Sequence, residues 1–289
     1  MVSITQSLRR IQDELAVLLA PSFIEQVCRE AGHRWRVRLL DPVTIVHLFI
    51  LQILHRNAAC AQVPRIAGRE FTASAYCQAR ARLPLKVIST LVTRIGTALQ
   101  DVTADRGAWH GHRVVLVDGS SFSMPDTPAL QKHFGQPGAQ KKGCGFPRAH
   151  LLAAFDAHSG LILEVIASAL RTHDMALASQ IHPKLRSGDL LVGDRGFCSF
   201  AHLALISQNE LQACLRMHQK QIVDFRPHRP HQRSKRASQG RPRSRWLKKL
   251  GVRDQLVDWI RPAAAPDWMS DTEFERLPAS LRVRELRHR

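Results

Sequence analysis

Hydrophobic positions in the first hundred residues recur at the three- to four-residue spacing of helices. Pro21 is expected to end the first helix, and Asp41 followed by Pro42 forms an N-cap with proline at the first helical position. Four helices are predicted, over about 8–19, 42–54, 72–83 and 88–99. The pattern therefore predicts an all-helical segment over 1–105.

The pattern changes to short apolar runs at Arg113. V-V-L-V from Val114 is continuous and β-branched, which predicts a strand buried on both faces. Two further runs are joined by A-H-S-G, which predicts a hairpin. The remaining expected elements are a helix from Asp174 to about Leu185, a strand at 189–193, a helix at 200–208, a strand at 211–216 and a strand at 281–289. This order of strand, strand, strand, helix, strand, helix, strand predicts an α/β core with a mixed sheet.

The net charge of +18 is distributed unevenly. Residues 1–112 carry 14 basic and 8 acidic side chains, a net charge of +6. Residues 113–215 carry 9 and 8, a net charge of +1, and residues 216–289 carry 19 and 8, a net charge of +11. Because Lys and Arg neutralise phosphates and release counterions, the flanking segments indicate a polyanion such as nucleic acid as a partner.

The arginine-rich stretch over roughly 226–245 has two compatible interpretations, a disordered solvated loop and a mobile phosphate-binding loop. Arg80 and Arg82, in the third predicted helix, could contact DNA or simply lie on a solvated helix face. The candidate DNA-binding residues are Lys141, Lys142, Arg148, Arg195, Arg233, Lys235, Arg236, Arg241, Arg243 and Arg245.

The six cysteines show no C-x-x-C pair, so neither a disulfide framework nor a zinc finger is indicated. The first twenty residues lack the apolar core of a signal peptide, and the most apolar run, about Val43 to Leu54, is too short to span a membrane. We therefore expect a protein of a reducing cytosol that is not associated with a membrane.

Two aspartates follow predicted strands. Asp118 comes directly after V-V-L-V, and Asp194 follows D-L-L-V-G. Loops at the carboxyl ends of strands in an α/β sheet commonly carry the chemistry. If the two strands are neighbours, the carboxylates converge on one point. A single aspartate in this position is more often a turn residue or a helix cap, so it is the pair that indicates a site.

Converging carboxylates need a shared proton or a cation. Oxygen ligands select Mg²⁺ or Mn²⁺, and such ions can promote attack on a phosphodiester. A basic surface together with an acidic pair therefore favours metal-dependent phosphoryl transfer on nucleic acid.

These residues resemble the DDE transposases of bacterial insertion sequences, in the insertion-sequence-four branch. The motifs that carry the resemblance are V-L-V-D-G-S at 115–120, the stretch at 146–165, R-T-H-D-M-A at 171–176, G-D-R-G-F-C-S-F at 193–200 and Y-C-Q-A-R-A-R-L-P at 76–84. The resemblance implies an RNase H-like core in which Asp118 and Asp194 are catalytic and bind the metal. It implies three domains: a helical DNA-binding domain at 1–112, an incomplete catalytic core at 113–215 and a basic, β-rich insertion at 216–289.

The third acid of the family, a glutamate in a Tyr-Arg-Glu helix, has no counterpart here. Glu210, Glu273, Glu275 and Glu285 follow Asp194, and their contexts indicate a turn, a D-T-E-F-E loop and the last strand, with all four at the surface. We therefore expect a truncated or split reading frame.

The first hypothesis is a DNA transposase, cleaving and joining transposon ends and target DNA and inactive as this chain alone. The alternative is a non-catalytic DNA-binding remnant or an inhibitor of the full-length transposase. A homo-oligomer and a fragment that does not fold stably are left open.

Overall fold

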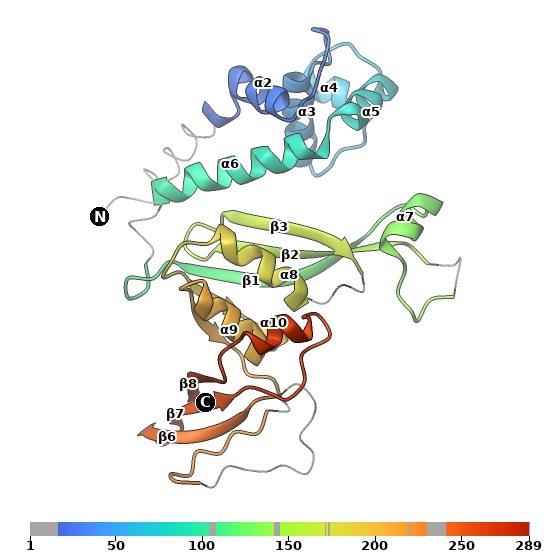
Figure 1. Ribbon diagram of the computed structural model, residues 1–289. Coiled ribbons are helices and arrows are strands. Elements are labelled where there is room, and N and C mark those ends of the chain that lie inside the picture. The colour runs from blue at the N-terminus through green and yellow to red at the C-terminus, as the bar shows by residue number, and fades with distance from the viewer. Residues whose placement is uncertain are drawn as a thin grey trace. The chain divides into compact units, whose positions relative to one another are not determined.

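The computed structural model describes residues 17–103, 108–141, 145–170, 172, 174–219, 221–229 and 241–288. The chain divides into two compact units, Met1–Ala104 and Asp105–Arg289 (Figure 1). In the described ranges, no helix combines the length and apolar character that crossing a membrane requires.

The first unit is helical, as predicted. Its helices are α2 (Pro21–Glu30), α3 (Pro42–Leu54), α4 (Val63–Ala67), α5 (Ala73–Arg82) and α6 (Leu85–Thr103). The Asp41 carboxylate caps α3 by accepting a hydrogen bond from the Thr44 amide at 2.7 Å. The described helical residues before Pro21 stop at Leu18, as expected, and Pro21 itself begins α2, which was not predicted. A proline is well suited to the first helical position because its missing N–H costs nothing there. The predicted helix at 8–19 lies almost entirely outside the described residues.

Helix α3 is the centre of this unit. Its apolar side chains enter two clusters, one with α2 and α6 around Ile24 and Leu91, and one with α5 around Tyr76. A helix that is apolar on most sides is stable in water only when neighbours cover it, which explains its membrane-like composition.

The second unit is built on a mixed sheet. Within the described residues its strands run in the order β3-β2-β1-β4-β5. The elements are β1 (Val114–Ser123), α7 (Pro128–Phe134), β2 (Arg148–Asp156), β3 (Ile162–Ala169), α8 (Asp174–Ile181), η1 (His182–Lys184), β4 (Leu190–Gly193), η2 (Arg195–Phe197), α9 (Phe200–Gln208) and β5 (Gln212–Leu215). β1 pairs antiparallel with β2 and parallel with β4. The predicted α/β class with a mixed sheet is confirmed; α7 was not predicted, and α8 ends at Ile181 rather than near Leu185.

The central strand β1 is buried on one face only. Val115 and Val117 lie in a core with residues of α8 and α9, whereas Leu116 is 41% exposed. Because side chains alternate along a strand, Asp118 lies on the same side as Leu116. The expectation of burial on both faces is wrong, and the strand is longer than predicted, because it continues through Asp118 to Ser123.

A second, three-stranded sheet covers α9. It consists of β6 (Arg243–Gly251), β7 (Asp254–Ile260) and β8 (Ser280–Leu286), with α10 (Asp271–Glu275) before the last strand (Figure 1). Phe200 and Ala204 of α9 pack against Trp259 and Phe274. Strand β8 confirms the predicted terminal strand. β6 was missed because its many basic residues masked the alternation, and it shows that the expected loop at 226–245 ends before Arg243.

Candidate active site

Asp118 and Asp194 stand side by side on the sheet. The parallel pairing of β1 with β4 ends at Val117 opposite Gly193, so Asp118 is the next residue of β1 and Asp194 directly follows β4. Both are exposed, and both line a pocket of about 530 Å³. The long-range pairing thus brings together two carboxylates that are far apart in sequence.

Local hydrogen bonds hold each carboxylate. Asp194 caps η2, because its Oδ1 accepts from the Gly196 amide at 2.9 Å. Asp118 Oδ1 accepts from the amide of Gly119 at 2.8 Å. Gly193 is needed beside Asp194, since a Cβ there would lie 3.2 Å from side-chain atoms of Leu215 and Phe197.

An unforeseen pair of side chains shares the pocket. His150, on β2, lies opposite Ser121 of β1, and its Nε2 is 2.8 Å from Oδ1 of Asp174. A Cβ at Gly119 would be 3.1 Å from each of these two atoms, so the pair rests directly on the backbone that follows Asp118. Sequence reasoning treated Asp174 as a helix cap and His150 as a strand residue. The R-T-H-D motif before a helix was the available signal.

The predicted basic contacts are only partly gathered around this pocket. Arg195 lines it, and its Nη1 donates to Gln219 Oε1 at 2.8 Å. Arg241 lines an adjoining pocket of about 450 Å³ that shares Asp174, Arg195 and His218 with the first. Arg195 thus places positive charge in the pocket of the two aspartates, and Arg241 places it in the adjoining pocket.

The other candidate DNA contacts lie elsewhere. Lys141 is exposed in a loop, and Arg148 begins β2; neither lines the pocket. Arg243 is exposed at the start of β6. Arg245 is bound to Asp258 at 2.9 Å, which compensates its charge and holds the pKa of that carboxyl below its usual value. Lys142, Arg233, Lys235 and Arg236 lie outside the described residues.

None of the four glutamates after Asp194 lines the pocket. Glu210 is in a turn with a φ of 57°, as expected. The D-T-E-F-E segment is not a loop but α10, whose N-terminus is closed by a capping box between Ser270 and Glu273. The surface assignment of Glu285 is wrong, because its side chain is buried and accepts from Trp259 Nε1 at 2.9 Å and Gln255 Nε2 at 2.7 Å.

Comparisons with known proteins agree with the motifs. The family model of the transposase DDE domain matches residues 109–288. The chain is 23% identical over 217 residues to the transposase for insertion sequence element IS231B of Bacillus thuringiensis subsp. berliner, and 22% identical over 216 residues to that for IS231F of Bacillus thuringiensis subsp. israelensis. Each alignment covers 72% of this chain and 44% of the relative, so the chain spans less than half the length of the curated relatives that it matches.

Among solved structures, the chain is similar to piggyBac transposase in a synaptic complex with hairpin DNA. The TM-score is 0.43 at 11% identity, over 86% of this chain and 58% of that one. It is also similar to Mos1 transposase in a paired-end complex, with a TM-score of 0.24 at 11% identity over 63% and 60% of the two chains. On the strength of the match over residues 109–288, this chain belongs to the transposase DDE domain family.

Proposed function

We propose that this chain is part of a DNA transposase in which Asp118 and Asp194 are the carboxylates of a metal-dependent phosphoryl-transfer site. The observation that carries the proposal is the β1–β4 pairing, which puts the two side chains at adjacent positions on one pocket. The reaction is attack of water on a phosphodiester at the element end. The freed 3′ hydroxyl then attacks a phosphodiester of the target, forming one P–O bond as another breaks.

The donor set fits Mg²⁺ or Mn²⁺. Each aspartate uses Oδ1 for a local amide, and in the described part of the chain Oδ2 of neither has a protein hydrogen-bond donor. Carboxylate oxygens are preferred by such hard cations, which commonly bind through one or two carboxylates together with waters and substrate phosphates. When bound, the cation would supply Lewis-acid stabilisation of the phosphoryl group and activation of the attacking water.

The chain's own groups would position the DNA. Arg195 in the pocket of the carboxylates and Arg241 in the adjoining pocket offer positive charge suited to phosphate oxygens. The His150–Asp174 pair would keep the backbone after Asp118 in place, because it packs on Gly119.

As part of this proposal, we expect these 289 residues alone to cleave DNA strands poorly. Within the described residues, no group of three His, Cys, Asp or Glu side chains could hold a metal ion, and the later glutamates lie away from the pocket. This same observation favours the second candidate function, a DNA-binding protein that occupies transposon ends without cutting them.

Titration of Mn²⁺ into the purified chain, followed by calorimetry, tests the site. Asp118→Asn and Asp194→Asn should each weaken Mn²⁺ binding at least about tenfold, since each removes a charged ligand. Asp267→Asn, which alters an exposed aspartate outside the pocket, is the matched control. Equal Mn²⁺ affinity in all four proteins would overturn the assignment. Robust Mg²⁺-dependent cleavage by the chain, abolished by Asp118→Ala, would instead contradict the expected inactivity.

A further inference from the structure

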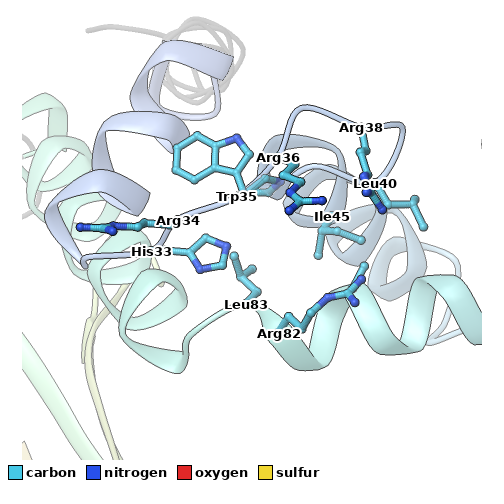
Figure 2. Close-up of a pocket in the computed structure, with 11 residues that line it drawn as sticks. His33, Arg34, Trp35, Arg36, Arg38, Leu40, Ile45, Arg82 and Leu83 are labelled. Carbon is cyan, nitrogen blue, oxygen red and sulfur yellow. The ribbon is translucent and has the colours of Figure 1, made fainter.

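The helical unit contains a pocket of about 310 Å³ lined by four arginines (Figure 2). Arg34, Arg36 and Arg38 come from the segment between α2 and α3, where an arginine occurs at every second position, and Arg82 is the last residue of α5.

None of these four arginines has an acidic partner among the described residues, in contrast to Arg29 and Arg94 of the same unit. Arg29 is bound to Glu25 at 2.7 Å, and Arg94 to Glu30. Arg80 donates to Gln52 Oε1 at 3.1 Å and stacks over Phe49 and Tyr76, so its guanidinium group is engaged in contacts within the helical unit. All four pocket arginines are exposed, and no carboxylate lines the pocket.

The acidic side chains nearest in sequence to Arg34, Arg36 and Arg38 already accept hydrogen bonds from other groups. Asp41 caps α3, and Glu30 accepts hydrogen bonds from Gln26 and Arg94, which lower the pKa of its carboxyl. Like charges around a hollow with partly apolar walls repel one another, and an anion bound between them relieves the repulsion. The electrostatics of the pocket therefore favour an anionic ligand.

The walls favour a nucleic acid over a small ion. Trp35 is half-buried, its ring stacks on His33 with centroids 5.8 Å apart, and both line the pocket. Figure 2 shows Arg36 on the segment between α2 and α3 and Arg82 on α5 on different sides of the same hollow. A row of arginines leading into a pocket suits a chain of phosphates, because guanidinium groups bind phosphate oxygens in a bidentate manner.

We propose that the pocket formed by Arg34, Arg36, Arg38 and Arg82 binds the phosphodiester backbone of duplex DNA, holding one strand through consecutive phosphates. The inference rests on the proposed function for its DNA partner, and it assigns part of that binding to the helical unit. Phosphate contacts position a protein on DNA without reading its sequence.

The test measures binding of the full 289-residue chain to two duplexes of unrelated sequence by fluorescence anisotropy, between about 50 and 200 mM salt. Arg36→Gln/Arg82→Gln should weaken both duplexes equally, roughly tenfold at low salt. The slope of log affinity against log salt should fall by about 2, one unit for each lost phosphate contact. Arg36→Lys/Arg82→Lys should keep the slope, because the charges remain.

The matched control is Arg65→Gln/Arg69→Gln, which removes two exposed arginines from the same unit outside the pocket. It should leave affinity and slope close to those of the wild type. If the pocket variant behaves like this control while the wild type binds DNA, the inference is overturned. Failure of the wild type to bind DNA at low salt would instead overturn the DNA partner in the proposed function.

Calorimetry with inorganic phosphate separates the two sources of phosphate. Phosphate binding that is lost in Arg36→Gln/Arg82→Gln, with duplex affinity unchanged, would make the pocket a small-anion site and reject DNA. The exposed positions of both side chains make unfolding of this variant unexpected, and circular dichroism checks it.

Discussion

His150 Nε2 lies 2.8 Å from Asp174 Oδ1, and the two side chains meet directly over Gly119. The pair connects β2 to the first turn of α8 across the backbone that follows Asp118. It explains why a glycine follows the aspartate, since any side chain at 119 would press on both partners. Two sets of contacts therefore fix the position of Asp118 in the pocket: the His150–Asp174 pair, which reaches from β2, and the pairing of β1 with β4.

Gly119→Ala should disturb this arrangement. Its Cβ would lie 3.1 Å from Asp174 Oδ1 and His150 Nε2, so the pair must move by a few tenths of an ångström. We expect a loss of about 1 kcal/mol in the free energy of unfolding, and weaker Mn²⁺ binding through displacement of Asp118. Gly138→Ala, where no atom lies within 4 Å of the new Cβ, should change neither quantity. Denaturant unfolding measures the stability of each variant, and calorimetry measures its Mn²⁺ affinity. If both variants give identical values, the His150–Asp174 pair does not position the backbone beside Asp118.

Asp189→Ala should strongly destabilise the second unit. The Asp189 side chain is 4% exposed, accepts from Arg113 Nε at 2.9 Å and from the Arg186 amide at 2.8 Å, and links the starts of β1 and β4. Removing it leaves the largely buried Arg113 guanidinium without its carboxylate, at a cost of about 3–5 kcal/mol. Asp254→Ala breaks a more exposed pair with Arg284, whose charges are screened by solvent, and should cost much less. Urea unfolding curves compare the two, and similar losses would refute the distinction.

Glu285→Gln tests whether the buried glutamate of β8 is structural. The carboxylate accepts from Trp259 and Gln255, and an amide can accept through only one of its two terminal atoms. We expect a loss of about 1–3 kcal/mol in stability, with Mn²⁺ affinity unchanged. Glu275→Gln, on the exposed side of α10, is the control and should alter neither. A loss of Mn²⁺ binding in folded Glu285→Gln would instead make Glu285 a metal ligand.

Acid should destabilise the protein through a buried histidine pair. His182 Nε2 lies 3.0 Å from His202 Nε2, and His202 Nδ1 donates to the Phe197 carbonyl at 2.7 Å, so both rings are neutral. Burial lowers the pKa of His182 to about 3 and that of His202 to about 4. Between these values and the unfolded pKa near 6.5, the unfolded chain binds more protons, so stability is complete above about pH 6.5 and falls as the pH decreases.

The expected loss is on the order of 2 kcal/mol per histidine by about pH 4.5. Thermal or urea unfolding across this range measures it. The paired carboxylates with lowered pKa values contribute only below about pH 4.5, so the interval from pH 6.5 to 5 isolates the histidines. His182→Leu/His202→Leu should flatten stability over that interval, whatever its absolute stability. A slope that persists in the double variant would exclude the pair as its cause.

Local pattern was sufficient for most elements. The Asp41–Pro42 cap, the hairpin turn at Gly160 and helix α9 were all predicted, because capping, positive φ and apolar spacing act within a few residues. The errors occurred where neighbours in space matter. Leu116 is exposed although the V-V-L-V run that contains it is entirely apolar. Strand β6 is rich in basic residues and is ordered by its pairing with β7, which no local pattern reveals.

The sequence by itself determined the two aspartates as candidates, since each follows a short apolar run typical of a strand. It also determined the motifs by which the chain belongs to its family. Only the tertiary structure decided that Asp118 and Asp194 are neighbours, that His150 and Asp174 pair over Gly119, that Glu285 is buried, and that Arg82 shares a pocket with Arg36. Each of these depends on contacts between residues about 20 or more positions apart, and such contacts arise from strand pairing and packing that no local pattern encodes.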